Sequence, residues 1–109
     1  MVLPLEGIRV LDFTVMMNGP SGGYQLADLG ADVIKIELPV RGEAARGIQS
    51  IFGTGTDVQG VNTLFDMLNR GKRGLTLDIN KPKGKDIFCR LVEKSDVFLT
   101  NYRKDQLAS

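Results

Sequence analysis

The residues best suited to chemistry in this chain lie in a loop that follows an apolar run near the N-terminus. The run Ile8–Phe13 has the length and composition of a buried strand, and the loop 15–19 follows it. Pro20 then suits the first turn of a helix, because its ring fixes φ and it lacks an N–H. A loop between a strand and a helix N-terminus offers unpaired N–H groups to an anion. Val15 to Gly23 are therefore a candidate ligand site, although the three glycines in this stretch serve turns and packing equally well.

A second candidate site is the basic turn 69–74, in which Arg70, Lys72 and Arg73 place three cations within four residues. Such a cluster can hold a phosphate group. A solvated turn explains the same composition and is the simpler interpretation. Three further arginines join the cluster if the long segment 38–60 folds over the same edge of the molecule: Arg41, Arg46 and Arg103.

Metal and thiol chemistry have little support in the composition. The chain has no histidine and one cysteine, so a histidine base, a disulfide framework and a cysteine metal site are excluded, and we expect no metal. Cys89 is predicted to lie at the edge of a buried helix stripe as a small apolar side chain. Asp12 and Asp78 lie in predicted strands, and we expect both to be structural acids that accept hydrogen bonds from loop N–H groups.

The first loop resembles a dinucleotide-binding site in its order of elements, but the spacing of its glycines differs from that of the dinucleotide-binding motif. A strand, glycines, a helix and then Glu37 at the end of a second strand follow the Rossmann order. A pyrophosphate turn needs G-x-G-x-x-G, whereas the glycines here begin at Gly19 and read G-x-x-G-G. This spacing argues against NAD binding, and the chain contains no P-loop motif.

Alternating strands and helices must position these candidate residues. Apolar and alternating runs predict strands near residues 8–13, 32–37, 75–79 and 97–100. Helices are predicted from Pro20 to Gly30, over residues 61–68, from Pro82 to Ser95 and after Arg103. Consecutive strand, helix and strand predict parallel strands with right-handed crossovers. The expected fold class is therefore α/β, a Rossmann-like open parallel sheet with flanking helices. The segment 38–60 shows no period and is either a functional loop or a missed element.

Composition bounds the remaining possibilities. With 109 residues, 42% of them hydrophobic, the chain amounts to at most one domain with a modest core. A formal net charge of +1 gives no field that attracts nucleic acid or a membrane surface, and we expect neither as a partner. No apolar run approaches the ~20 residues of a membrane helix, and the N-terminus lacks a signal-peptide pattern. We therefore expect a cytoplasmic protein.

Five sequence blocks, taken in order, carry a resemblance to a known family. They are PLEGIRVLDFT, LADLGADVIKIE, NRGKRGLTLDI, KPKGKDIF and SDVFLTNYR. Together they resemble the N-terminal part of the class III CoA-transferase family (CaiB/BaiF, or formyl-CoA transferase-like), over Pro4 to Arg103. The resemblance implies that residues 1–109 form an incomplete N-terminal part of a Rossmann-like large domain, in a protein whose two chains interlock as a homodimer. It also implies transfer of CoA between an acyl-CoA thioester and a carboxylic acid, with CoA as substrate and no permanently bound cofactor.

The resemblance assigns roles to residues at the ends of the predicted strands. It implies an active-site loop formed by Met16, Met17 and Asn18, whose apolar neighbourhood suggests a bulkier or more hydrophobic acyl group. Leu38 stands where some members have an arginine, so Arg41 is the candidate substitute for it. The CoA-binding residues that the resemblance implies are Met17, Asn18, Arg41, Arg46, Leu77, Asn80, Asn101, Tyr102 and Arg103.

The family's nucleophile is an aspartate whose carboxylate attacks the thioester and forms a covalent intermediate. The resemblance puts this aspartate beyond residue 109, so no catalytic residue is predicted within the chain, and we expect the chain alone to be inactive. Two alternatives remain open: an acyl-CoA racemase or epimerase of the same fold, and a CoA- or nucleotide-binding module without catalysis.

Overall fold

A computed structural model describes residues 2–51 and 53–108; Met1, Phe52 and Ser109 lie outside the described residues. The elements in chain order are β1 (Arg9–Phe13), α1 (Asn18–Asp28), β2 (Asp32–Glu37), the 3-10 helix η1 (Ala44–Gly47), β3 (Ser50–Ile51), β4 (Thr54–Gly55), β5 (Asp57–Val58), β6 (Val61–Asn62), α2 (Thr63–Asn69), β7 (Arg73–Thr76), α3 (Pro82–Glu93), β8 (Val97–Thr100) and α4 (Lys104–Ala108).

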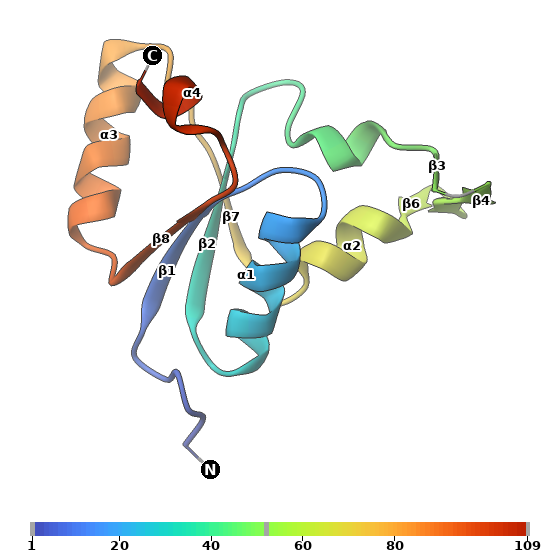
Figure 1. Ribbon diagram of the computed structural model, residues 1–109, viewed down its shortest axis with the longest axis horizontal. Coiled ribbons are helices and arrows are strands. Elements are labelled where there is room, and N and C mark those ends of the chain that lie inside the picture. Colours follow the sequence, from blue (N-terminus) through green and yellow to red (C-terminus); the bar gives the residue numbers. More distant parts are fainter. Residues whose placement is uncertain (1, 52, 109) are drawn as a thin grey trace.

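The main sheet is parallel throughout and has the strand order β7-β2-β1-β8 (Figure 1). The predicted α/β class is confirmed, and the strands predicted at 32–37 and 97–100 have the bounds of β2 and β8. The strand predicted at 75–79 is shifted toward the N-terminus and is observed as β7. Its pairing with β2 begins at Arg73 opposite Ile34 and ends at Thr76 opposite Glu37. All four carboxyl ends therefore meet at one edge, which is the upper edge in Figure 1 and is called the carboxyl edge below.

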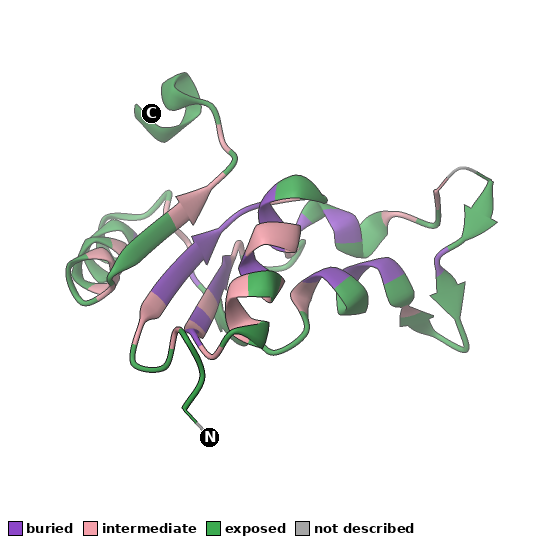
Figure 2. Ribbon diagram, turned by 60° about the horizontal axis from the view of Figure 1, so that its bottom comes forward, coloured by how far each residue is buried: buried purple, intermediate pink, exposed green. Residues whose placement is uncertain are grey.

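Each face of the sheet has its own apolar cluster, because neighbouring residues of a strand point to opposite faces. On one face, Val10 and Val33 pack with α1 side chains, including Leu26 and Ala27. The other face packs against α3 through buried Leu11, Phe13, Ile36 and Leu77, with Phe88, Leu91 and Val92 of the helix. Burial is concentrated in the two central strands, shown in purple in Figure 2, whereas the edge strand β8 is partly exposed.

The helices α1 and α3 begin near the prolines that predicted their starts, and α1 ends near its predicted glycine, but two predictions about the buried face of α3 are wrong. Helix α1 starts at Asn18, so Pro20 lies in its first turn, and Gly30 beyond its end has a φ of +102°, which suits glycine. Helix α3 starts at Pro82 as predicted. The predicted apolar face of α3 is only partly buried, because Ile87 is exposed. Cys89 is exposed as well, rather than lying at the edge of the buried stripe.

The segment 38–60 contains elements that its sequence did not reveal. It includes η1, the hairpin β3-β4, and β5, which pairs with β6. Helix α2 starts at Thr63 instead of Val61, because the Asn62 side chain accepts a hydrogen bond from the Phe65 N–H (3.0 Å) and caps the helix. A third cluster of buried side chains joins η1 to α2: Ala45, Leu64, Phe65 and Leu68.

A buried ion pair lies between β1 and α1. Lys72 Nζ is 2.7 Å from Asp12 Oδ2, and the two side chains are 2% and 0% exposed. Lys72 also donates to the Pro20 carbonyl (3.0 Å), and the Thr14 hydroxyl donates to Asp12. A Cβ at position 23 would clash with both members of the pair, so Gly23 is a packing glycine. Asp12 is thus a structural acid, but its partners are a hydroxyl and an ammonium group rather than the loop N–H groups expected.

The basic turn lies at the opposite edge of the sheet, where β7 begins. Arg70 pairs with Asp28 (2.7 Å) and Arg73 pairs with Asp32 (2.7 Å). Since Lys72 is committed to Asp12, all three cations of the turn have protein partners. The turn therefore has ion-pair partners that a merely solvated loop lacks, and the phosphate site considered for it remains a prediction. Among the described residues, no helix is both long and apolar enough to cross a membrane.

Replacing Lys72 by methionine should lower the free energy of unfolding by about 3–5 kcal/mol, because it leaves the Asp12 carboxylate buried without its counter-charge. Urea denaturation at neutral pH measures this loss. Arg90→Met is the matched control, since the Arg90–Asp86 pair is exposed and long (3.9 Å) and contributes below about 1 kcal/mol. Equal stability losses in the two variants would contradict the structural role assigned to the buried pair.

Candidate functional site

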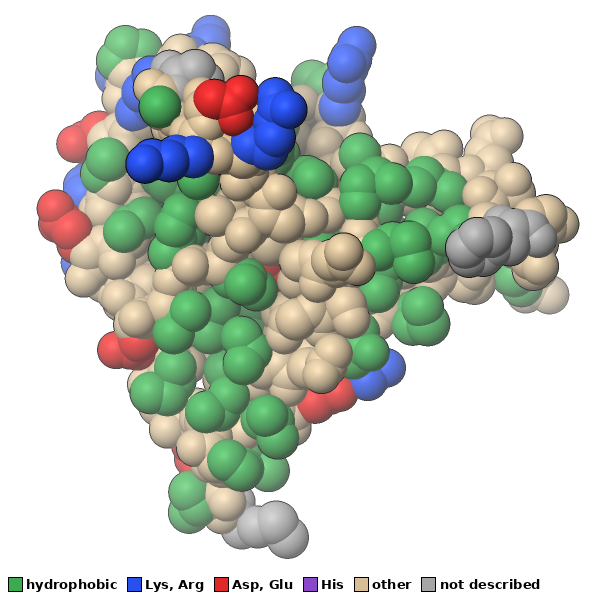
Figure 3. All heavy atoms as spheres, viewed as in Figure 1, with side chains coloured by type: hydrophobic (Ala, Val, Ile, Leu, Met, Phe, Trp, Pro, Cys, Tyr) green, Lys and Arg blue, Asp and Glu red, His purple; other side chains and the backbone are tan. Residues whose placement is uncertain are grey.

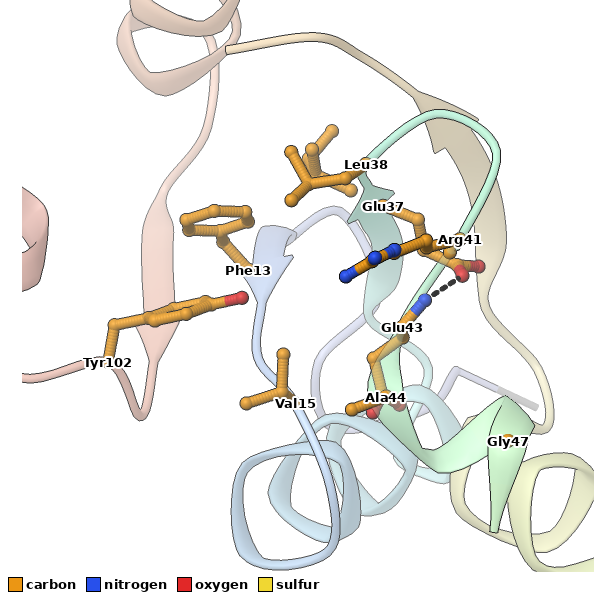
Figure 4. Close-up of a pocket in the computed structure, with 11 residues that line it drawn as sticks. Phe13, Val15, Glu37, Leu38, Arg41, Glu43, Ala44, Gly47 and Tyr102 are labelled. Carbon is orange, nitrogen blue, oxygen red and sulfur yellow. Dashed lines mark hydrogen bonds between the residues drawn. The ribbon is translucent and has the colours of Figure 1, made fainter. Parts of the chain in front are cut away.

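A cavity opens at the carboxyl edge, where β1, β2 and β8 end. Its volume is about 420 Å³ (Figure 4). One side is formed by the end of β1 and the residues that follow β8, and the other by the segment from the end of β2 to η1. Its lining consists of Phe13, Val15, Ile36, Glu37, Leu38, Arg41, Gly42, Glu43, Ala44, Gly47 and Tyr102. The site therefore combines an apolar surface with a few charged groups, as small-molecule sites do.

Two stacked aromatic rings form one wall of this cavity. The Phe13 and Tyr102 rings lie 4.7 Å apart at their centroids, with 25° between their planes. Phe88 of α3 supports Phe13 from the side, in an edge contact at 5.5 Å. Burial raises the pKa of the Tyr102 phenol, so at neutral pH this group is uncharged and is available as a hydrogen-bond donor.

Glu37 and Arg46 form a bidentate pair beside the cavity. The Arg46 Nε and Nη2 donate to the two Glu37 oxygens at 2.8 Å each. The Glu43 N–H adds a third bond to Glu37 at 2.7 Å, drawn as a dashed line in Figure 4. The Arg46 guanidinium holds the pKa of the Glu37 carboxyl below its usual value and also lies over the Phe65 ring at 3.7 Å. Protein groups thus already engage the charge of Arg46.

Arg41 differs from Arg46 although both follow β2. Among residues 2–51 and 53–108, the Arg41 guanidinium has no ion pair or side-chain hydrogen bond. Figure 4 shows it directed into the cavity on the side of Glu43. A guanidinium in such a position is able to bind a carboxylate or phosphate with two parallel hydrogen bonds. Arg41 is therefore the cation of this cavity that is available to an anionic ligand.

Asn101 holds the loop after β1 to the end of β8. Its Oδ1 accepts the Val15 N–H at 2.9 Å, and its Nδ2 donates to the Val15 carbonyl at 2.7 Å. Both polar atoms of this side chain are used in fixing one residue of the cavity wall. The observed contacts of Asn101 are those of a residue that positions the loop.

The other residues that the resemblance implied are distributed around the edge. Met17 lines a separate apolar groove with Ile51, Leu64 and Met67, and Asn18 is the exposed first residue of α1.

Leu77 is buried in the apolar cluster that contains Phe13 and Ile36, and Asn80 lines a second cavity of about 430 Å³ between α3 and α4. Arg103 pairs with Asp105 at 3.1 Å. The structure thus brings Arg41 and Tyr102 into the first cavity, with Arg46 and Asn101 beside it, and Phe13 borders both cavities. The ligand roles of all these residues remain predictions.

Sequence reasoning missed the buried pair of Lys35 and Glu43 at the site. Their side chains are 3% and 1% exposed, and Glu43 lines the cavity. One signal was available: a lysine in the middle of DVIKIE, a strand predicted to be covered on both faces, must have a buried partner. The described residues contain no group of three or more side chains able to hold a metal ion.

Residues 5–109 match the family model described as CoA-transferase family III. A formyl-CoA:oxalate CoA-transferase from Bradyrhizobium sp. (strain ORS 278) is 44% identical over 103 residues, which are 94% of this chain and 23% of that protein. A succinate–glutarate CoA-transferase from Agrobacterium fabrum is 39% identical over 106 residues, 96% of this chain and 26% of that protein.

Solved structures show the same similarity in three dimensions. A mutant form of Rv3272 from Mycobacterium tuberculosis has a TM-score of 0.85 and 42% identity, over 98% of this chain and 27% of that chain. A CaiB/BaiF family protein from Brucella suis has a TM-score of 0.84 and 36% identity, over 99% of this chain and 28% of that chain. The chain spans about a quarter of the length of these relatives.

The Glu37–Arg46 pair predicts part of the pH dependence of stability. The folded-state pKa of Glu37 lies below its ordinary value of 4.5, so the pair contributes stability above about pH 4.5 that is lost as the pH falls through the lower folded-state pKa. Replacing Arg46 by glutamine should make the fall in unfolding free energy between about pH 5 and pH 3 less steep. Arg41→Gln is the control and should follow the unmodified chain, because Arg41 has no described acidic partner. Parallel pH profiles for Arg46→Gln and the unmodified chain would contradict the assignment.

Proposed function

This chain belongs to CoA-transferase family III, and we propose that it forms the part of a CoA-transferase that binds a CoA thioester at the carboxyl edge of its parallel sheet. The family match confirms the resemblance found in the sequence. The observation that carries the proposal is the cavity at the ends of β1, β2 and β8, which combines an aromatic wall, apolar side chains and one arginine that has no ion pair or side-chain hydrogen bond among the described residues.

The chemistry of a CoA thioester fits these groups. Its phosphates and the carboxylate of the acceptor acid are anions, and Arg41 offers a fork of N–H donors to either. Lysine and arginine side chains, blue in Figure 3, stand along the same upper edge of the molecule, over α4 and over the loop after β2, in which Arg41 is the one basic residue of the sequence 38–43. The acyl chain and the methylene and methyl groups of the pantetheine arm are apolar, and Val15, Ile36 and Leu38 offer them an apolar surface. The apolar lining also supports a bulky or hydrophobic acyl group.

In the proposed reaction CoA moves from an acyl-CoA thioester to a carboxylic acid, and the described residues bind and position the reactants. The acids around the edge are already engaged, because Asp12 pairs with Lys72, Glu37 with Arg46 and Glu43 with Lys35. We propose that none of them is the nucleophile and that the aspartate expected from the resemblance fills this role in a longer protein. The chain alone should not exchange CoA between succinyl-CoA and added acids, and turnover above background would contradict this.

Two further proposals follow from the resemblance. Residues 1–109 form the N-terminal part of the large domain, and the active protein is an interlocked homodimer. A racemase of the same fold would instead exchange the α-proton of its substrate with solvent, so deuterium incorporation by the full enzyme would favour that alternative.

Arg41→Gln should weaken binding of acetyl-CoA about tenfold, roughly 1.4 kcal/mol, because it removes a charged hydrogen-bond donor from the cavity. Isothermal titration calorimetry of the chain with acetyl-CoA measures this change. Arg73→Gln is the charge-matched control at the opposite edge and should leave the affinity unchanged. Equal affinities of the unmodified and Arg41→Gln chains, or a loss confined to Arg73→Gln, would overturn the assignment of the site.

A further inference from the structure

A second buried ion pair lies at the candidate site, and one of its members, Glu43, lines the cavity. Lys35 Nζ of β2 is 3.5 Å from Glu43 Oε2, and the side chains are 3% and 1% exposed. Lys35 also donates to the Thr14 carbonyl at 3.1 Å. The ammonium group therefore connects the loop after β1 with the segment after β2.

The other oxygen of Glu43 makes two contacts of a different kind. Glu43 Oε1 accepts the N–H of Met16 at 2.7 Å and the N–H of Ala45 at 2.8 Å. Met16 belongs to the loop after β1, and Ala45 belongs to η1. These two segments belong to different walls of the cavity, through Val15 and Ala44, which lie next to each other in Figure 4, so one carboxylate joins both walls.

The backbone of the loop requires such support. Met16 has a φ of +68°, a left-handed conformation that is unfavourable for a residue with a side chain. The accepted Met16 N–H and the Lys35–Thr14 bond fix the peptide groups on both sides of Val15. The other side-chain hydrogen bonds to Val15 and Met16 in the described part of the chain are those of Asn101 to Val15.

We propose that Glu43, held in place by Lys35, is a positioning residue that sets the distance between the two walls of the CoA-thioester cavity. The inference rests on the proposed function, because it identifies what keeps that cavity in a binding-competent shape. The acceptor oxygen of Glu43 acts on the walls, and the charge of Lys35 serves to keep this oxygen buried and oriented. Glu43 lines the cavity, and we expect it to affect ligand binding through the backbone N–H groups that its Oε1 holds in place.

Two double variants separate these roles. Lys35→Met with Glu43→Gln removes both charges but keeps an amide oxygen that can accept from Met16 and Ala45. Lys35→Met with Glu43→Leu has a similar volume and the same charge but no acceptor. We expect the leucine variant to bind acetyl-CoA about tenfold more weakly than the glutamine variant, and its Met16 amide to exchange with solvent about tenfold faster. Urea denaturation of both variants checks that they remain folded.

Equal acetyl-CoA affinity and equal Met16 exchange in the two double variants would overturn the proposal. If the leucine variant does not fold, the single variant Glu43→Asp replaces it, because the shorter side chain keeps the charge but withdraws the oxygen from Met16. Compared with the unmodified chain, Glu43→Asp should bind acetyl-CoA more weakly and its Met16 amide should exchange faster. The exchange measurement needs no ligand, so it tests the positioning role by itself. Failure of the unmodified chain to bind acetyl-CoA would instead count against the proposed function.

Discussion

The structure depends on two buried lysine side chains beside the loop after β1, because each of them requires a carboxylate partner within the fold. Lys72 pairs with Asp12 and Lys35 with Glu43, and Thr14 connects the pairs, since its hydroxyl donates to Asp12 and its carbonyl accepts from Lys35. Each ammonium group stays buried only if its carboxylate stays close. The paired groups come from β1, β2 and the segments following β2 and α2, so these elements are tied together under the carboxyl edge.

The sequence predicted those helices and strands whose bounds depend on the local pattern of apolar residues and prolines. Apolar, β-branched runs identified β2 and β8 with their observed bounds, and Pro82 marked the start of α3. The remaining differences come from tertiary contacts. Strand β7 starts at Arg73 because pairing with β2 sets its register, and alternation along the sequence carries no information about that partner.

The edge of the sheet that holds the candidate site could be predicted from the sequence, but the contacts of its residues could not. The rule that parallel strands present their carboxyl ends at one edge led to the region of Arg41 and Tyr102. Sequence alone could not distinguish Arg41 from Arg46, because only the folded chain brings Glu37 against one of them and not the other. Glu43 was missed because its partners belong to other segments and its acceptor atom serves backbone N–H groups, which have no residue signature.

The central claim is that the carboxyl edge, rather than the basic turn at the other end of the sheet, binds a CoA thioester. The most direct test is a ¹H–¹⁵N NMR titration of the ¹⁵N-labelled chain with acetyl-CoA. We expect the largest amide shift changes at Val15, Gly42 and Tyr102, which line the cavity. Shift changes concentrated at Arg70 to Gly74, or no changes at saturating acetyl-CoA, would contradict it.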